Sequence, residues 1–234
     1  MFIQSDAIRD YVLPIASAEI IDGKTKLTIL GSAFLIGSQG FALTARHVIL
    51  NSENAKLIAM FTPQSGGWFA VDITAREMHP SEDVALVELD EIDGTSWKSF
   101  FRLSNSFENA SCKYRLWGYP DDATFELIAN NQVLIRPDLV YNEGYIRRRY
   151  TGAVPAIRGT SFFELSEIAG TGASGGPVYK FTKPVWDVIG VYVGEKINDR
   201  GTSVSYAVRE EAFRNWEPTI LGKSILAESQ NVTA

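Results

Sequence analysis

A serine between glycines is the residue of this chain best suited to chemistry. Residues 170–177 read GTGASGGP and contain Ser174. Glycines allow backbone N–H groups to converge beside a hydroxyl, so a serine in this setting can act as a nucleophile. The segment also fits two other patterns, because GASGG matches the GxSxG turn of esterases and GTGASG matches the GxGxxG loop that binds dinucleotides.

The order of residues along the chain decides among these three interpretations. Both histidines, His47 and His79, precede Ser174, whereas the esterase pattern requires its histidine after the serine. A dinucleotide loop opens a helix, but Pro177 is followed by the β-prone run VYKF. The order histidine, aspartate, serine remains, and it is one of the known orders of a serine-histidine-aspartate triad.

Two more motifs occur upstream in that order. Residues 41–48 read FALTARHV, and residues 82–89 read EDVALVEL. Together with GASGGP they resemble the histidine, aspartate and serine motifs of the trypsin and chymotrypsin superfamily, and the resemblance spans residues 15–210.

The resemblance implies a role for each motif residue. His47 would be the general base, Asp83 the acid that orients it and Ser174 the nucleophile, with the N–H groups of Gly172 and Ser174 as the oxyanion hole. The chemistry agrees, because a serine hydroxyl needs a base whose pKa lies near the working pH, and histidine is that base. The other histidine, His79, precedes a proline turn and is predicted to be a surface or packing residue.

Asp83 is chosen over its acidic neighbours by position. The orienting acid of a triad must be buried beside the imidazole, and Asp83 lies where the chain enters the apolar strand VALVEL. We therefore expect Asp83 to be buried, and we expect the adjacent Glu82 to face water.

One departure from the family concerns the residue before the nucleophile. Secreted digestive members have an aspartate there, which pairs with a newly cut N-terminus, but this chain has Ala173. In this respect the chain is similar to disulfide-free bacterial trypsin-like peptidases, such as the catalytic domain of HtrA-like proteases. The 26 residues after position 208 are too few for a PDZ domain.

Composition predicts an intracellular globular enzyme. The chain has 234 residues, 45% of them hydrophobic, and a net charge of −6, which disfavours a nucleic-acid partner. Cys112 is the only cysteine, so no intrachain disulfide can form, and no metal site or cofactor is expected. The N-terminus does not resemble a signal peptide, and no run is long enough for a membrane helix. We expect a bacterial, cytoplasmic protein with no membrane partner.

The dominant period of two, broken by Gly, Asn and Pro, predicts an all-β fold. The resemblance specifies two six-stranded antiparallel Greek-key barrels of the chymotrypsin type. Residues 1–100 would form the barrel with the histidine and aspartate, and residues 101–234 the barrel with the serine, connected by a crossover at 91–100. Helical spacing predicts a short C-terminal helix at 209–216, packed on the second barrel.

Specificity rests on the resemblance. The residue six before the nucleophile, Ile168, would form the base of the pocket for the substrate residue before the cut, called P1, which predicts an apolar P1 residue. The alternative is that Ile168 belongs to the core and an insertion shifts the pocket. Val191, Tyr192 and Val193 resemble the strand that pairs with extended substrate, and Tyr192 would restrict the pocket wall.

The predicted function is a serine endopeptidase whose partner is a protein or peptide substrate. The alternative is a partner-activated or catalytically idle module on the same fold, which binds peptides or a regulatory protein encoded nearby. The basic cluster Arg147–Arg149 is predicted to be a solvated hairpin rather than a docking patch for an acidic partner.

Overall fold

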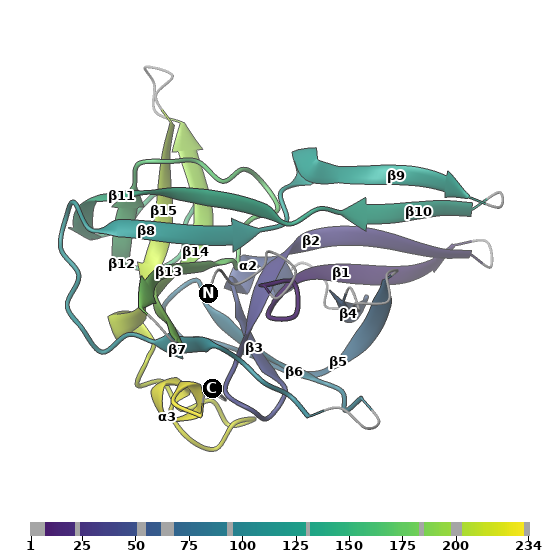
Figure 1. Cartoon of the computed structure of the whole chain (residues 1–234), viewed down its shortest axis with the longest axis horizontal. Coiled ribbons are helices and arrows are strands. Elements are labelled where there is room, and N and C mark those ends of the chain that lie inside the picture. Colours follow the sequence, from purple (N-terminus) through teal and green to yellow (C-terminus); the bar gives the residue numbers. More distant parts are fainter. Residues whose placement is uncertain are drawn as a thin grey trace.

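The computed structural model describes residues 8–21, 24–50, 55–61, 68–92, 96–129, 132–182, 185–197 and 203–231. These segments build a molecule composed almost wholly of β-strands. Two barrels lie side by side, the first at the lower right of Figure 1 and the second at the left. This arrangement confirms the chymotrypsin-like fold class predicted from the motifs.

The first barrel closes because β1 pairs with both β2 and β4. The strand order is β1-β2-β3-β6-β5-β4. Its short apolar runs suit a buried, pleated surface, as in β6, where only Glu88 is not buried. The strands are β1 (Val12–Ile21), β2 (Lys24–Ile36), β3 (Phe41–Thr44), β4 (Lys56–Phe61), β5 (Phe69–Met78) and β6 (Ala85–Leu89).

The second barrel has the order β13-β8-β11-β12-β15-β14 and closes because β13 pairs with β14. The short β7 adds to β14 in parallel, and β9 and β10 form a separate hairpin. This hairpin and the β1–β2 hairpin project from the same side of the molecule (Figure 1). The strands are β7 (Phe101–Leu103), β8 (Lys113–Gly118), β9 (Thr124–Ala129), β10 (Gln132–Pro137), β11 (Val140–Thr151), β12 (Ser161–Leu165), β13 (Pro177–Thr182), β14 (Val185–Ile197) and β15 (Ser203–Arg209).

The helical elements are short: α2 (Arg46–Leu50), η1 (Asp121–Ala123), η2 (Glu210–Ala212) and α3 (Ile225–Ser229). The prediction of a helix at 209–216 is wrong. Strand β15 continues through Arg209, which pairs with Gly190, and only η2 follows it as a single 3-10 turn. Sheet pairing therefore takes the first residue of the segment, and the rest forms a 3-10 turn and further turns instead of an α-helix.

The C-terminal helix is α3. Its first turn is capped by Ser224, whose side chain accepts the N–H of Ala227 at 3.2 Å. The helix packs against β7, where Ser229 Oγ accepts the N–H of Leu103 at 3.2 Å, and against the β2–β3 turn, where Glu228 accepts the N–H of Ser38 at 2.9 Å. It therefore contacts the first barrel and the strand that follows the crossover.

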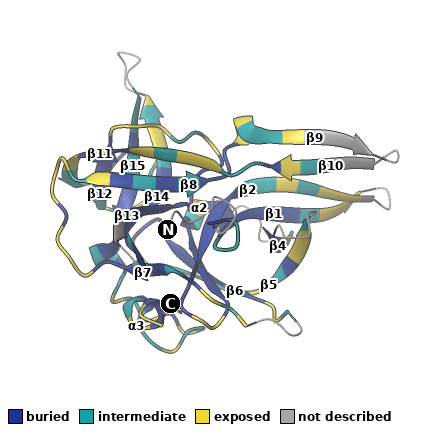
Figure 2. Ribbon diagram, in the orientation of Figure 1, coloured by how far each residue is buried: buried dark blue, intermediate teal, exposed yellow. Residues whose placement is uncertain are grey.

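An aromatic cluster joins the two barrels. Phe101 in β7 contacts Phe34 of the first barrel at a ring-centroid distance of 5.4 Å, and Tyr179 and Trp186 of the second at 5.5 and 5.0 Å. Each such pair contributes about 0.5–1.5 kcal/mol beyond the area it buries. Buried residues, dark blue in Figure 2, run through both barrels. The cluster fixes the relative position of the two halves, on which any site between them depends.

Candidate active site

The structure brings His47 and Asp83 together at one edge of the first barrel. Helix α2, which contains His47, follows β3, and Asp83 precedes β6, which pairs with β3. Asp83 Oδ2 lies 2.7 Å from His47 Nδ1, and Asp83 Oδ1 accepts the backbone N–H of His47 at 3.0 Å. The side chain of Asp83 is 5% exposed and that of His47 is 44% exposed. The carboxylate assigns the ring proton to Nδ1, which leaves Nε2 as the acceptor.

The loop that carries Ser174 packs against the first barrel close to His47. The carbonyl of Ser174 accepts the N–H of Ser32 in β2 at 2.7 Å. A Cβ on Gly31 would lie 2.8 Å from that carbonyl oxygen and 2.6 Å from Cγ2 of Val48, the residue after His47. Within the described residues the Ser174 hydroxyl makes no hydrogen bond. In resting enzymes the contact between nucleophile and base commonly tightens only when substrate binds.

The two N–H groups predicted to form the oxyanion hole have no acceptor among the described residues. In the described part of the chain, the N–H groups of Gly172 and Ser174 donate no hydrogen bond. Gly172 has a φ of +90°, and a Cβ there would lie 2.6 Å from the carbonyl oxygen of Tyr119. Both its conformation and its close packing therefore require glycine. Two unpaired amides beside a serine hydroxyl can bind a developing negative charge.

The prediction that Glu82 faces water is wrong. Glu82 is 5% exposed, and its Oε2 accepts the N–H of Thr160 at 3.1 Å. Arg158 adds a second contact between the barrels by donating to the carbonyl of Pro80 at 2.5 Å. The carboxylate of Glu82 is buried because Thr160 of the second barrel replaces water with its backbone N–H and, at 3.4 Å, with its hydroxyl. Thr160 lies 78 residues away in sequence, so no local pattern identified this contact beside Asp83.

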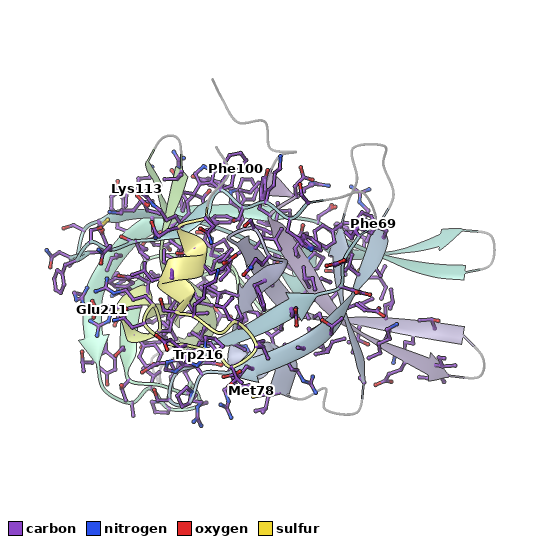
Figure 3. The ribbon with its side chains drawn as sticks, turned by 90° about the horizontal axis from the view of Figure 1, so that it is seen from below. Phe69, Met78, Phe100, Lys113, Glu211 and Trp216 are labelled. Carbon is purple, nitrogen blue, oxygen red and sulfur yellow. The ribbon has the colours of Figure 1, made fainter. Side chains whose placement is uncertain are left out.

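His79 holds the turn that precedes Asp83 and lies outside the site. It is 7% exposed, and its Nδ1 accepts the N–H of Glu82 at 3.0 Å. Its ring meets Trp216 edge-on at 5.1 Å, and Figure 3 shows Trp216 beside Met78, the residue before His79. Burial lowers the pKa of His79, and the charge of Arg158 lowers it further. The ring therefore favours the neutral form, in which Nδ1 accepts a hydrogen bond and the ring packs on Trp216. This agrees with a packing role.

Comparison with known proteins decides the family. The family model described as the trypsin-like peptidase domain matches the sequence over residues 31–191. This stretch contains His47, Asp83 and Ser174. The chain belongs to this family. It is thus a serine protease, as its motifs predict. No curated protein is detectably similar to it in sequence.

Solved peptidase structures share the fold at low sequence identity. The MamO protease domain from Magnetospirillum magneticum has a TM-score of 0.60 and 14% identity, covering 88% of this chain and 94% of that chain. The Rv3671c protease of M. tuberculosis in its active form has a TM-score of 0.61 and 17% identity, covering 97% and 84%. The HtrA-type protease AlgW with a decapeptide has a TM-score of 0.58 and 16% identity, covering 90% of this chain and 65% of that chain. The present chain therefore spans just under two thirds of AlgW.

The predicted substrate strand of the peptidase lies beside the nucleophile loop. Val191, Tyr192 and Val193 are buried in β14. The carbonyl of Tyr192 accepts the N–H of Gly175 at 2.7 Å. A Cβ on Gly194 would lie 3.8 Å from Ser174 Oγ, so Gly194 also borders the site. Sequence reasoning missed Gly194, although an isolated glycine in a strand often marks a close approach.

Ile168 is not a core residue of the peptidase. It is 40% exposed, and its carbonyl accepts a hydrogen bond from Asn142 Nδ2 at 3.0 Å. Tyr192, in contrast, is fully buried, and its hydroxyl accepts the N–H of Ala169 at 3.3 Å. The tyrosine side chain therefore spans the distance between β14 and the segment that precedes the nucleophile loop.

The three arginines of the basic cluster are paired within the chain. Arg147 and Arg148 contact Glu164 at 3.3 and 2.6 Å, and Arg149 contacts Glu211 at 2.5 Å. Two carboxylates thus face the three guanidinium groups, and Glu211 also contacts Arg209 at 3.3 Å. The ion pairs therefore offset only part of the positive charge of the cluster, and the side chains of Arg147 and Arg148 remain exposed to solvent.

Metal ligation and cysteine chemistry find no second site in the segments that the structure describes. Within the described residues, no three His, Cys, Asp or Glu side chains are grouped to hold a metal ion. In the same segments, no helix has the length and apolar character needed to span a membrane. The pKa of Cys112 is raised to about 11, chiefly by burial and also by Glu108, so its thiol stays protonated near neutral pH and is a poor nucleophile.

Proposed function

We propose that the chain is a serine endopeptidase that forms an acyl-enzyme on Ser174. The proposal rests above all on Asp83, a buried carboxylate that uses both oxygens on His47, one at 2.7 Å from the ring and one at 3.0 Å from the backbone nitrogen. In an ion pair with a purely structural role, Nε2 of His47 would not need to stay accessible. Here the His47 side chain is 44% exposed, so its Nε2 can receive the proton of the Ser174 hydroxyl.

In the proposed reaction, Ser174 Oγ attacks the carbonyl carbon of the scissile peptide bond. Its proton passes to His47 Nε2, and Asp83 stabilises the resulting imidazolium. The carbonyl oxygen becomes an oxyanion that accepts hydrogen bonds from the N–H groups of Gly172 and Ser174. His47 then protonates the leaving amine, and water releases the acyl group by the reverse steps.

A fluorophosphonate probe tests the proposal directly. We expect the purified chain to be labelled stoichiometrically, because an activated serine attacks the phosphorus and displaces fluoride. Mass spectrometry should locate the adduct on Ser174, and Ser174→Ala should abolish it. Ser104→Ala, which removes another buried serine hydroxyl, is the matched control and should label normally. Labelling that appears only with a cell extract would favour the partner-activated alternative, and none under either condition would contradict catalysis.

We further propose a small apolar P1 residue. By the resemblance, the P1 pocket would lie between β14 and the segment around Ile168. Tyr192 would fill that region, because it is fully buried in β14 and its hydroxyl accepts the N–H of Ala169 at 3.3 Å. An aromatic side chain buries about 150–250 Å², so little depth remains for a substrate side chain. Alanine or valine fits such a pocket, whereas lysine or arginine would find no carboxylate partner there.

Cleavage of a peptide library should show this preference. We expect cuts after alanine and valine, with kcat/KM for phenylalanine or arginine at P1 lower by about 10- to 200-fold. Tyr192→Val should admit larger P1 residues, whereas Tyr192→Phe, which keeps the volume, should leave the profile unchanged. Abundant cleavage after arginine or an aromatic residue in the unaltered chain would refute the pocket assignment.

A further inference from the structure

The nucleophile loop, residues 170–176, is also the oxyanion loop, because it contains Gly172 and Ser174. It lacks the aspartate that orders this loop in the secreted digestive members of the superfamily. The residue before the nucleophile is Ala173, which is 1% exposed and packs in the core of the second barrel. No ion pair can form at an alanine side chain. Hydrogen bonds to the backbone must therefore hold the loop in shape.

Ser32 in β2 supplies these contacts on both sides of Ala173. Its hydroxyl donates to the carbonyl of Gly172 at 2.9 Å, and its backbone N–H donates to the carbonyl of Ser174 at 2.7 Å. The same hydroxyl accepts the N–H of Tyr119 at 2.9 Å. Ser32 is fully buried, so water cannot replace these bonds.

The contacts determine where the N–H of Gly172 points. The carbonyl of Thr171 accepts the N–H of Asp121 at 2.7 Å, and the carbonyl of Gly172 accepts the hydroxyl of Ser32 at 2.9 Å. Peptide planes are rigid, and in each trans peptide the C=O and N–H point in opposite directions. Asp121 therefore holds the first plane, which contains the N–H of Gly172, and Ser32 holds the second, in which the N–H of Ala173 also donates to the carbonyl of Gly170 at 3.3 Å. With the second plane held, Gly172 cannot rotate freely between the two. Its N–H, which belongs to the first plane, is directed away from Asp121 and finds no protein acceptor among the described residues.

We propose that Ser32 is a positioning residue for catalysis, whose hydroxyl keeps the oxyanion loop in its binding conformation without an activation event. The hydroxyl links three segments: strand β2, the turn after β8 and the nucleophile loop. It does so as a neutral hydrogen-bond bridge in place of an ion pair. The inference rests on the proposed function, because an oriented Gly172 N–H matters only if an oxyanion forms there.

Ser99 offers a matched control. It is also fully buried, and its hydroxyl also bridges two backbone groups, donating to the carbonyl of Leu35 at 2.6 Å and accepting the N–H of Phe101 at 3.0 Å. Neither group belongs to the oxyanion loop. Ser32→Ala and Ser99→Ala therefore remove equivalent bonds and should lower Tm by similar amounts.

Kinetics and NMR of the two variants test the proposal. With a peptide substrate that has alanine at P1, we expect Ser32→Ala to lower kcat by about 10- to 100-fold with little change in KM, because the loss affects mainly the transition state. Ser99→Ala should keep the kcat of the unaltered chain. The amide signals of Gly172 and Ser174 in ¹⁵N-labelled protein should broaden in Ser32→Ala and stay sharp in Ser99→Ala.

The two readouts separate the two hypotheses. An unchanged kcat and sharp loop signals in Ser32→Ala would overturn the positioning role, even in an active protease. Equal kcat losses in both variants would also overturn it, since they would reflect general destabilisation. If the loop signals broaden only in Ser32→Ala but the unaltered chain never reacts with the fluorophosphonate, the ordering of the loop by Ser32 stands, whereas the endopeptidase function fails and the catalytic role of Ser32 fails with it.

Discussion

Ser174→Ala and His47→Ala should each lower kcat by about a million-fold, and the double variant should lose no more than either single one. The nucleophile and its base act as a unit, so removing either one removes the whole covalent route. A residual rate of about 1,000- to 10,000-fold over water should persist, because the amides of Gly172 and Ser174 and the binding strand remain. This non-additivity distinguishes a catalytic pair from two residues that contribute separately.

Single-turnover and steady-state assays on the three variants, at substrate concentrations above KM, measure the effect. His79→Gln is the control, because it alters the other histidine of the chain and should leave the enzyme active at the same pH. If the losses of Ser174→Ala and His47→Ala multiply in the double variant, the two side chains do not act on the same proton, and the mechanism fails.

The Asp83→Asn variant should lose about 10,000-fold in kcat while KM changes little. Asp83 accepts the backbone N–H of His47 with Oδ1 and the ring Nδ1–H with Oδ2. An amide has one oxygen for these two donors. When its oxygen takes the backbone N–H, its NH₂ group faces Nδ1, and the ring proton must move to Nε2. The ring can then no longer accept the proton of Ser174.

The adjacent carboxylate provides the control for this change. Glu82→Gln makes the same chemical replacement one residue earlier, but Glu82 accepts hydrogen bonds from Thr160 at 3.1 Å and none from His47. We expect it to lower Tm with only a small effect on kcat. Equal kcat losses for Asp83→Asn and Glu82→Gln would indicate that both act through the stability of the loop. Retained activity in Asp83→Asn would exclude it as the orienting acid.

The family and the fold class could be predicted from the sequence because they depend on local patterns. Alternation along VALVEL predicts a strand, and the order of His47, Asp83 and Ser174 excludes the esterase turn. The helix predicted at 209–216 failed because local spacing cannot reveal that Arg209 pairs with Gly190 in β14. Propensity is a weak signal, and the pairing of distant strands overrides it.

The residue types available for acyl transfer and the strand periods of two barrels can be read along the chain. Which of these groups meet depends on the folded structure. It buried Glu82 against Thr160, filled the region beside Ile168 with Tyr192, and connected Ser32 to Gly172 across 140 residues. Strand periodicity is local to a few residues, whereas a buried polar group must find its partner wherever the closed barrels bring one within hydrogen-bonding distance.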